Sequence, residues 1–112
     1  MVTKTYIPEQ GDIVYFDFSP TNGREQKGVR PALVISRAIL NKKNGLVVVI
    51  PITSQQKGYP FEVEIKAAKI SGVALVDQVR SMDYVARKFK RVSRISETAF
   101  EEVRAKFMAL AQ

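Results

Sequence analysis

The sequence predicts a mainly β fold with a C-terminal helix, in which a curled sheet or small barrel forms the body of an α+β protein. Three observations predict it. Apolar and polar residues alternate with a period of two in short segments, most clearly in residues 61–66. Residues 46–50 form an unbroken, mostly β-branched apolar run, and residues 100–110 place apolar side chains at helical spacing. Five or more short strands with one terminal helix fit a curled sheet or barrel.

The N-terminal half of the predicted sheet begins with a strand over residues 12–18, where apolar and polar positions alternate. Residues 19–30 then form a loop that is long for a hairpin, and long ordered loops tend to be functional. Residues 31–36 are predicted to form the second strand.

The middle of the chain contains one short helical turn and one buried strand. Residues 38–40 are predicted to form the turn, which the polar segment 41–45 ends. The apolar run 46–50 predicts a strand buried on both faces. We expect this strand to end at Pro51, with residues 52–54 as its exit.

Three further segments complete the predicted sheet. Residues 61–66 predict a strand with one buried and one solvated face. Residues 73–76 and 78–80 predict a single strand that bends near Asp77, and residues 90–95 a short last strand.

The C-terminal segment is predicted to be a helix that Ser96 or Thr98 caps, with acidic residues near its positive N-terminal end. One face carries apolar residues that we expect in the core or at an interface: Phe100, Val103, Phe107 and Leu110.

Composition limits the possible function classes. The 112 residues fit one domain, 1–112, and 18 Lys and Arg against 11 Asp and Glu give a net charge of +7. This charge suits a polyanionic partner such as nucleic acid, and a generally basic, solvated surface is the alternative. No apolar run approaches the roughly 20 residues of a membrane-spanning helix, and the N-terminus lacks a signal-peptide core. We therefore expect a soluble cytoplasmic protein without a membrane partner.

The absence of histidine and cysteine restricts the chemistry. Histidine acid–base pairs, Ser-His-Asp triads, cysteine nucleophiles and histidine or thiolate metal sites are all excluded. Catalysis would therefore use Arg, Lys, Thr, Ser, Tyr or carboxylates, and we expect no metal and no cofactor. Asp12 and Asp17 fit turn or edge positions better than a metal pair.

The segment 23–31 combines two glycines, a carboxylate, an amide and cations between two predicted strands. Glycine allows a backbone to approach a ligand closely, and a guanidinium offers a planar fork to phosphate oxygens. Arg30 precedes Pro31, which favours an extended conformation at Arg30. These features predict a phosphate-binding loop, although Arg30 paired with Glu25 in a surface ion bridge is an alternative.

A second basic segment follows residue 79, with cations interrupted by Tyr84 and Phe89. Cations beside stacking rings are typical of single-stranded RNA binding, and an ordinary solvated face is the alternative. Its cations are Arg80, Arg87, Lys88, Lys90, Arg91 and Arg94.

An ordered set of motifs resembles the MazF/PemK/ChpB family of toxin endoribonucleases from type II toxin–antitoxin systems. The resemblance runs from about Gly11 into the C-terminal helix. The matching segments are Gly11-Asp12-Ile13-Val14, Asp17-Phe18-Ser19-Pro20-Thr21, Glu25-Gln26, Arg30-Pro31-Ala32-Leu33-Val34-Ile35-Ser36, Pro51-Ile52-Thr53 and Asp77-Gln78-Val79-Arg80-Ser81-Met82-Asp83.

The resemblance implies an SH3-like small barrel and a sequence-specific, metal-independent endoribonuclease that cleaves single-stranded RNA, chiefly mRNA. It implies that Arg30 and Thr53 are the catalytic pair, yielding a 2′,3′-cyclic phosphate and a 5′-OH end. It further implies a homodimer, inhibition by a cognate MazE-like antitoxin with an acidic flexible tail, and DNA binding of the toxin–antitoxin complex.

The residue chemistry agrees with these roles. Arg30 can stabilise charge on phosphoryl oxygens, and Thr53 can donate a hydroxyl hydrogen to the same phosphate. Glu25 could act as a base, but the cations around it favour its charged form, so a positioning role is preferred. Residues expected to contact RNA are Arg24, Gln26, Lys27, Gly28, Ser54, Lys57, Gln78, Arg80 and Arg87.

Two other functions remain open from the sequence. A toxin group with a similar barrel traps DNA gyrase, but that group uses a C-terminal tryptophan and this chain contains no tryptophan. A noncatalytic RNA-binding or protein-interaction barrel would carry the same basic surface without cleaving RNA.

Overall fold

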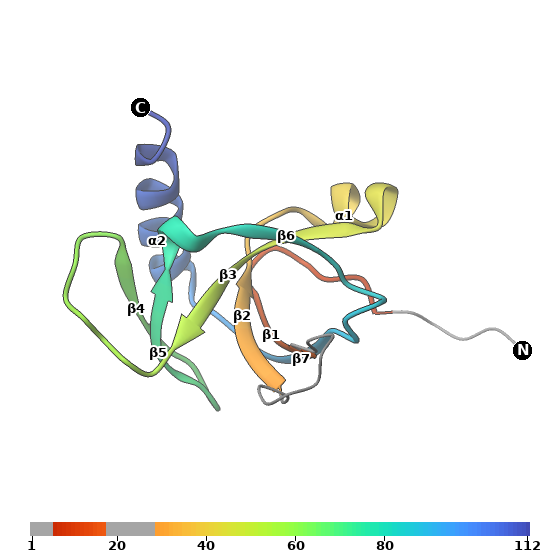
Figure 1. The fold of residues 1–112 in the computed structure, drawn as a ribbon, viewed down its shortest axis with the longest axis horizontal. Coiled ribbons are helices and arrows are strands. Elements are labelled where there is room, and N and C mark those ends of the chain that lie inside the picture. Colours follow the sequence, from red (N-terminus) through yellow and green to blue (C-terminus); the bar gives the residue numbers. More distant parts are fainter. Residues whose placement is uncertain (1–5, 18–28) are drawn as a thin grey trace, which may run out of the picture.

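The protein is represented by a computed structural model, and the structure describes residues 6–17 and 29–112. Figure 1 shows a curled, barrel-like sheet with a helix at each of two corners. The elements, in chain order, are β1 (Asp12–Asp17), β2 (Val29–Val34), α1 (Ala38–Asn44), β3 (Leu46–Thr53), β4 (Glu62–Lys66), β5 (Ser71–Leu75), the 3-10 turn η1 (Val76–Gln78), β6 (Arg80–Asp83), β7 (Lys90–Arg94) and α2 (Glu97–Ala109). The predicted mainly β fold with a C-terminal helix is confirmed.

The strands follow the order β4-β5-β3-β2-β1-β7, and β6 pairs with β3 outside this path. All strand pairs are antiparallel. One strand, β3, therefore pairs with three others: with β2, with β6 along its first half, and with β5 at its last two residues. This strand joins the two parts of the sheet (Figure 1).

The expectation that the buried strand ends at Pro51 is wrong, because β3 continues to Thr53. Pro51 still pairs with Ala32 of β2, whereas Ile52 and Thr53 pair with β5. Proline cannot donate a backbone hydrogen bond and is tolerated where pairing changes. Here it lies where β3 leaves one partner strand and joins another.

The helical turn predicted at residues 38–40 is longer than expected and runs to Asn44. Asn41 does not break the helix, because its buried side chain donates to the carbonyl oxygens of Pro8 and Ser36 and accepts from the Ser36 hydroxyl. Gly45 ends the helix with a φ of 75°, which glycine adopts without strain.

The segment predicted as one bent strand over residues 73–80 is two strands. The 3-10 turn η1 separates β5 from β6, and the chain continues antiparallel to β3, from the last two residues of β3 to its first half. Val76 is buried inside this turn and fixes it to the core.

Two apolar clusters fill the two faces of the sheet, and consecutive residues of β1 belong to different clusters. Ile13 lies in the cluster that also receives Val103 of α2, whereas Val14 lies in the cluster that contains Phe89 and Tyr84. The alternation with a period of two in β1 therefore corresponds to a strand that is buried on both faces. Ser96 caps α2 by accepting a hydrogen bond from the Ala99 backbone N–H, as predicted.

The predicted use of Tyr84 and Phe89 as exposed stacking rings is wrong. Both rings are buried, Phe89 stacks on Phe16 with ring centroids 5.4 Å apart, and the Tyr84 hydroxyl donates to the Asn41 carbonyl. The two rings lie in the turn between β6 and β7, and they anchor this turn to the core.

Asp12 is a buried carboxylate that ties β1 to β7. Its side chain is only 2% exposed and accepts from Arg94 Nη1 at 2.8 Å, Arg91 Nε at 3.3 Å and the Glu9 backbone N–H at 3.1 Å. The Tyr6 hydroxyl also donates to it, and burial, followed by the bond to this carboxylate, raises the pKa of Tyr6. Two cations of the second basic segment thus stabilise the fold.

No helix among residues 6–17 and 29–112 is long and apolar enough to cross a membrane.

Replacing Asp12 should destabilise the fold. Asp12→Ala removes the carboxylate that accepts hydrogen bonds from four donors. Two of these donors, Arg91 and Arg94, are half exposed, so water can solvate them in the variant. We therefore expect the free energy of unfolding to fall by about 2–3 kcal/mol. Urea denaturation monitored by circular dichroism measures it. Glu64→Ala, which removes an exposed carboxylate from a surface ion pair, is the control and should change stability by less than about 0.5 kcal/mol. Equal effects of the two variants would contradict the structural role of Asp12.

Candidate functional site

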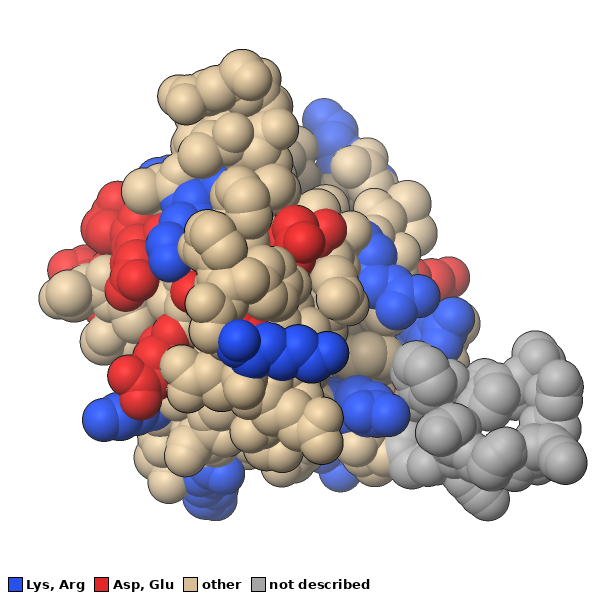
Figure 2. Space-filling view, turned by 60° about the vertical axis from the view of Figure 1, so that its left-hand side comes forward, with Lys and Arg blue, Asp and Glu red and all other residues tan. Residues whose placement is uncertain are grey.

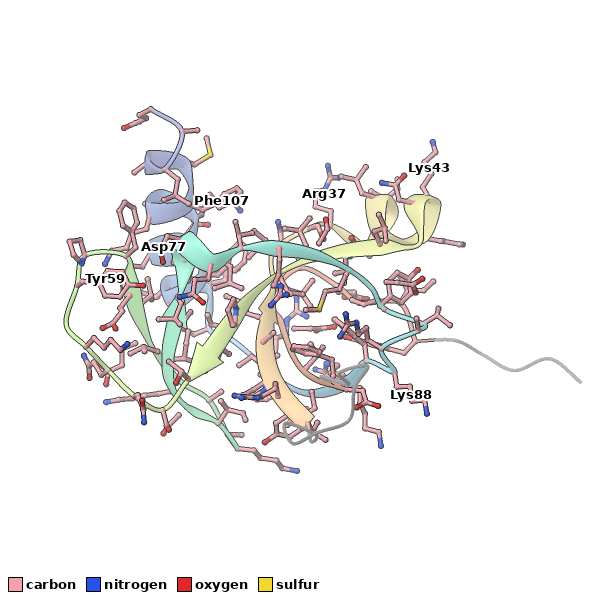
Figure 3. All side chains as sticks on the ribbon, viewed as in Figure 1. Arg37, Lys43, Tyr59, Asp77, Lys88 and Phe107 are labelled. Atoms are coloured by element: carbon pink, nitrogen blue, oxygen red, sulfur yellow. The ribbon has the colours of Figure 1, made fainter. Side chains whose placement is uncertain are left out.

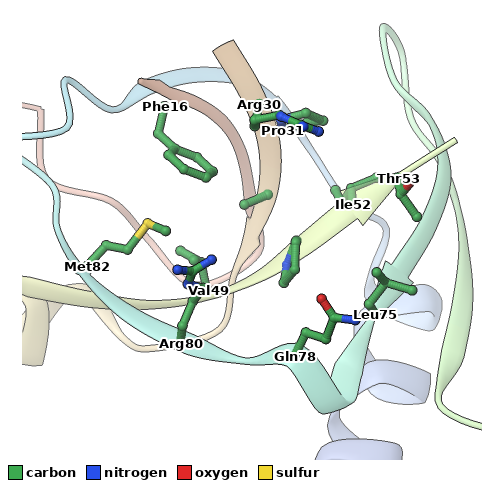
Figure 4. A pocket seen from close by; sticks show the side chains of 12 residues that line it. Phe16, Arg30, Pro31, Val49, Ile52, Thr53, Leu75, Gln78, Arg80 and Met82 are labelled. Atoms are coloured by element: carbon green, nitrogen blue, oxygen red, sulfur yellow. The ribbon is translucent and has the colours of Figure 1, made fainter. Parts of the chain in front are cut away.

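A pocket lies where β2, β3 and η1–β6 converge, and we call it the central pocket. Figure 4 shows Arg30 and Pro31 on one side, Gln78 and Arg80 on the other, and Thr53 beside Ile52 at one end. Phe16, Val49 and Met82 form an apolar floor. An apolar floor with a few convergent polar groups at the rim is typical of a ligand site.

Arg30 is positioned by the start of β2. It pairs with Phe16 of β1, and the following Pro31 pairs with Tyr15, so the backbone on both sides of the guanidinium is held in the sheet. The Arg30 side chain is exposed. A rigid base with an exposed planar fork suits recognition of phosphate oxygens.

Thr53 is positioned by the end of β3, where it pairs with Val73 of β5. Its Oγ1 accepts a hydrogen bond from the Gln55 backbone N–H at 3.2 Å. Because this bond uses an oxygen lone pair, the hydroxyl hydrogen remains available for donation to a ligand. Arg30 and Thr53 therefore reach one pocket from two neighbouring strands.

Gln78 and Arg80 reach the same pocket from the opposite side. Gln78 ends the 3-10 turn η1, and Arg80 opens β6, paired with Val49 of β3. Both side chains are exposed. Their place in this pocket depends on the 3-10 turn η1, through which the chain passes along β3 from its pairing in β5 to its pairing in β6.

Two further depressions adjoin the central pocket, and Thr53 lines all three. The first, which we call the loop pocket, lies between Thr53, Gln78 and the residues Gln55, Lys57 and Tyr59 of the β3–β4 loop. The second, which we call the hairpin pocket, is lined by residues of β2, of the end of β3 and of the β4–β5 turn: Val29, Arg30, Pro31, Ile52, Thr53, Ser54, Lys69, Ile70 and Ser71.

The β3–β4 loop is held in place by a buried carboxylate. Glu62 accepts from the backbone N–H groups of Lys57 and Gly58, both at 2.8 Å, and its side chain is buried. The expected solvent-facing position of Glu62 is therefore wrong. Tyr59 donates its hydroxyl to Asp77 at 2.9 Å, and this bond raises the pKa of Tyr59 (Figure 3). The loop is thus fixed to the turn that carries Gln78.

Charge around the site is one-sided. Among the described residues that line the three pockets, cations are present and Asp and Glu are absent. On the face shown in Figure 2, most carboxylates gather towards the left, while a group of Lys and Arg lies to the right. Concave surfaces lined by one sign of charge attract ligands of the other sign, so the site favours an anion.

Most of the predicted site residues that the structure describes come together. Arg30, Thr53, Gln78 and Arg80 line the central pocket, Ser54 the hairpin pocket and Lys57 the loop pocket. Arg87 lies apart, on the turn between β6 and β7, where its backbone carbonyl accepts from Asp17 N–H. The predictions for Arg24, Glu25, Gln26, Lys27 and Gly28 fall outside the described residues.

Sequence reasoning missed the residues that the hairpin places at the site. Lys69 and Ser71 line the hairpin pocket. No motif marks them. The only sign of them in the sequence is their position, just after a segment that alternates between apolar and polar residues.

The described part of the chain contains no cluster of three or more His, Cys, Asp or Glu residues that could hold a metal ion. The groups present at the site are cations, amides and hydroxyls. Such groups can bind an anionic backbone, read the hydrogen-bonding edge of a base and stabilise negative charge that develops on a phosphate.

Comparison with known proteins agrees with this geometry. Residues 9–111 match the family model described as PemK-like, MazF-like toxin of type II toxin–antitoxin system. The chain is 41% identical over 105 residues to the endoribonuclease toxin MazF of Escherichia coli K12, covering 94% of this chain and 95% of that protein. It is 36% identical over 118 residues to the endoribonuclease toxin ChpB of the same strain, with both chains fully covered.

The fold also matches solved structures. A MazE–MazF crystal structure from Deinococcus radiodurans superposes with a TM-score of 0.89 at 42% identity, covering 96% of this chain and 97% of that one. An endoribonuclease from a mycobacterial species, only 15% identical, shares the fold with a TM-score of 0.75. The family model spans nearly the whole chain and the sequence identities are high, so the chain belongs to the PemK-like, MazF-like toxin family of type II toxin–antitoxin systems.

Proposed function

We propose that this protein is a sequence-specific, metal-independent endoribonuclease toxin that cleaves single-stranded RNA, chiefly mRNA in the cytoplasm, and thereby inhibits translation and growth. The observation that carries the proposal is the joint lining of one cationic pocket by Arg30 and Thr53 from adjacent strands. The activity named for its relatives, endoribonuclease, supports it.

RNA supplies its own nucleophile, so the protein needs to orient the reactants and stabilise charge. The 2′ oxygen attacks the neighbouring phosphorus and forms a P–O2′ bond, while the P–O5′ bond breaks. The 2′ proton is lost to a base and the departing O5′ gains a proton, which leaves a 2′,3′-cyclic phosphate and a 5′-OH. Arg30 binds the phosphoryl oxygens as their charge grows, and Thr53 donates its hydroxyl hydrogen to the same group.

The neighbouring groups select and hold the RNA. The apolar floor of the central pocket suits the face of an unstacked base, and the Gln78 amide suits its hydrogen-bonding edge. Arg80, Lys57 and Ser54 suit backbone phosphates around it. For Arg87, which lies away from the three pockets, a phosphate contact requires a longer stretch of bound RNA.

Residues outside the described part complete the proposal. Glu25 has the positioning role, accepting from a base edge, a 2′-OH or Arg30. The adjoining residues Arg24, Gln26, Lys27 and Gly28 contact the RNA backbone and bases.

The proposed partners are a second copy of the chain and a cognate MazE-like antitoxin. The family description and the MazE–MazF structures that share this fold support the antitoxin. Exposed apolar residues on α1 and at the start of β3 support an interface between copies: Ile39 is 65% exposed, Leu40 48% and Leu46 47%. Large exposed apolar groups that lie close together often mark protein contacts.

The first test is cleavage of a long single-stranded RNA by purified protein in excess EDTA, with the 5′ ends mapped. We expect discrete cuts with 5′-OH ends. Arg30→Ala should lower kcat by about 10²–10³-fold, the loss measured when one preorganised transition-state donor is removed. Thr53→Ala should lower it by about 10–100-fold, since a hydrogen bond to a charged group is lost.

Arg104→Ala, which removes an arginine of α2 that lines none of the three pockets, is the matched control and should cleave like the wild type. Intact RNA with correctly folded wild-type protein would contradict the proposed function. Undiminished cleavage by Arg30→Ala would contradict the role of Arg30 while leaving the activity in place.

Thr53 also depends on a close approach of β5. A Cβ atom at position 72 would lie 2.4 Å from the Thr53 carbonyl oxygen and 3.1 Å from its carbonyl carbon. Contacts below 3.0 Å do not persist in folded proteins, and here the contacted atoms are backbone atoms that cannot rotate away. Gly72 therefore allows β5 to approach the backbone that positions Thr53.

Gly72→Ala should displace the end of β3 and misplace the Thr53 hydroxyl. We expect kcat to fall by at least about 10-fold with a smaller change in KM, because displacement of a reacting group by about 1 Å can cost about 100-fold. Single-turnover kinetics separate the two parameters. Val63→Ala, a buried truncation on β4, controls for lost stability, and assays run well below both melting temperatures. A kcat equal to that of Val63→Ala would contradict a positioning role for Gly72.

The proposed homodimer predicts a particle of twice the mass of one chain in sedimentation equilibrium. If the α1 face forms the interface, Leu46→Glu should shift the protein towards monomers, because a buried unpaired charge is costly. Met108→Glu, which alters an exposed apolar residue on α2, should leave the mass unchanged. Dissociation by Met108→Glu alone would place the interface on α2 instead.

A further inference from the structure

The hairpin pocket shares the wall made by Arg30, Pro31, Ile52 and Thr53 with the central pocket, and has a different far wall. That far wall is the β4–β5 turn, which contributes Lys69, Ile70 and Ser71. The hairpin pocket measures about 480 Å³, larger than the central pocket at about 290 Å³. An RNA strand whose scissile phosphate lies at Arg30 and Thr53 therefore has a second depression directly beside it.

The turn that carries Lys69 has a fixed backbone. The Ala67 N–H donates to the Ile70 carbonyl at 2.9 Å, and Lys66 pairs with Ser71 across the strands. Ile70 is only 8% exposed and packs into the core between the flanking strands. The backbone of Lys69 is consequently anchored at the pocket wall.

The charge of Lys69 is available to a ligand. Its side chain is exposed and makes no hydrogen bond or ion pair with any residue that the structure describes. Lys66, on the same hairpin, instead lies 3.8 Å from Glu64 and is not a lining residue. The two lysines thus differ in position and in electrostatic surroundings, although they are three residues apart.

The lining chemistry distinguishes the two pockets. The central pocket has the apolar floor of Phe16, Val49 and Met82, which suits a base. The hairpin pocket instead presents cations on opposite walls, Arg30 and Lys69, together with the hydroxyls of Ser54 and Ser71. Cations and hydroxyls are the side chains that bind the phosphates of nucleic acids.

We propose that the hairpin pocket binds an RNA backbone phosphate next to the scissile one, with Lys69 as its cation. The inference rests on the proposed function and deepens it, because it gives the path of the bound RNA. The RNA backbone runs from the central pocket, past Thr53, into the hairpin pocket. Lys69 acts in binding and does not touch the reacting atoms.

The test begins with the cleavage site mapped for the wild type. A short RNA spanning that site, with a 2′-O-methyl group replacing the attacking 2′-OH, binds without being cut. A series of such RNAs replaces one phosphate at a time by a neutral methylphosphonate, and fluorescence anisotropy gives Kd for each. The wild type, Lys69→Ala, Lys69→Arg and the control Lys66→Ala are compared. Arg104→Ala, at an arginine of α2 that lines none of the three pockets, is a second control.

We expect Lys69→Ala to raise Kd for the unmodified RNA by about 3- to 10-fold and to reduce the slope of log K against log salt by about 0.7, the value for one lost contact to a single strand. Neutralising one phosphate near the cleavage site should lower the affinity of the wild type for the RNA. The same neutralisation should change the affinity of Lys69→Ala only slightly. Lys69→Arg should restore the sensitivity, and both control variants should keep the wild-type pattern.

Two outcomes would overturn the inference, and they are distinguishable. If the wild type cuts RNA and the Lys69→Ala scan matches the wild-type scan, the proposed function stands and the phosphate site at Lys69 is wrong. If correctly folded wild type neither binds nor cuts RNA, the proposed function fails and the inference fails with it. Melting temperatures of the variants, measured in parallel, exclude misfolding as the cause of a weaker Kd.

Discussion

The structure depends on one strand, β3, hydrogen-bonded to three others. Residues 46–49 of this strand pair with β6, residues 49–51 pair with β2, and the last two residues pair with β5. Apolar side chains bury this strand on both faces, because Val47 and Val49 belong to one cluster and Ile50 and Ile52 to the other. Thr53 ends the strand and lines the central, loop and hairpin pockets. Stability and the geometry of the candidate site thus share a single backbone segment.

Two buried carboxylates of this chain hold the fold together. Asp12 accepts hydrogen bonds from two arginines and joins β1 to β7, while Glu62 fixes the β3–β4 loop. Buried carboxylates are tolerated only when donors surround them, and both have several. The described lining of the three pockets contains cations and no Asp or Glu, which favours a polyanion.

The catalysis that we propose for Arg30 and Thr53 requires accurate placement of these groups more than unusual reactivity. A guanidinium and a hydroxyl need no pKa adjustment to bind a phosphate, and RNA provides the nucleophile. Their distance and orientation are set by strand pairing, with Arg30 opposite Phe16 and Thr53 opposite Val73. The absence of a side chain at Gly72 permits the close approach of β5 that completes this geometry. Residues on rigid strands hold such geometry better than residues on loops, because their backbone bonds are already satisfied.

The sequence by itself determined the mainly β class, the C-terminal helix with Ser96 or Thr98 as its cap, and the family, because alternation, capping chemistry and ordered motifs are local signals. It also identified Arg30, Thr53, Gln78 and Arg80 as site candidates, and the structure brings these four residues to one pocket. Only the tertiary structure decided the continuation of β3 beyond Pro51, the separation of β5 from β6, and the burial of Glu62, Tyr84 and Phe89. Lys69 became a site residue in the same way, through the packing of a hairpin turn against Thr53. These features depend on partners distant in the chain, and neither propensity nor periodicity encodes which strand or carboxylate a residue will meet.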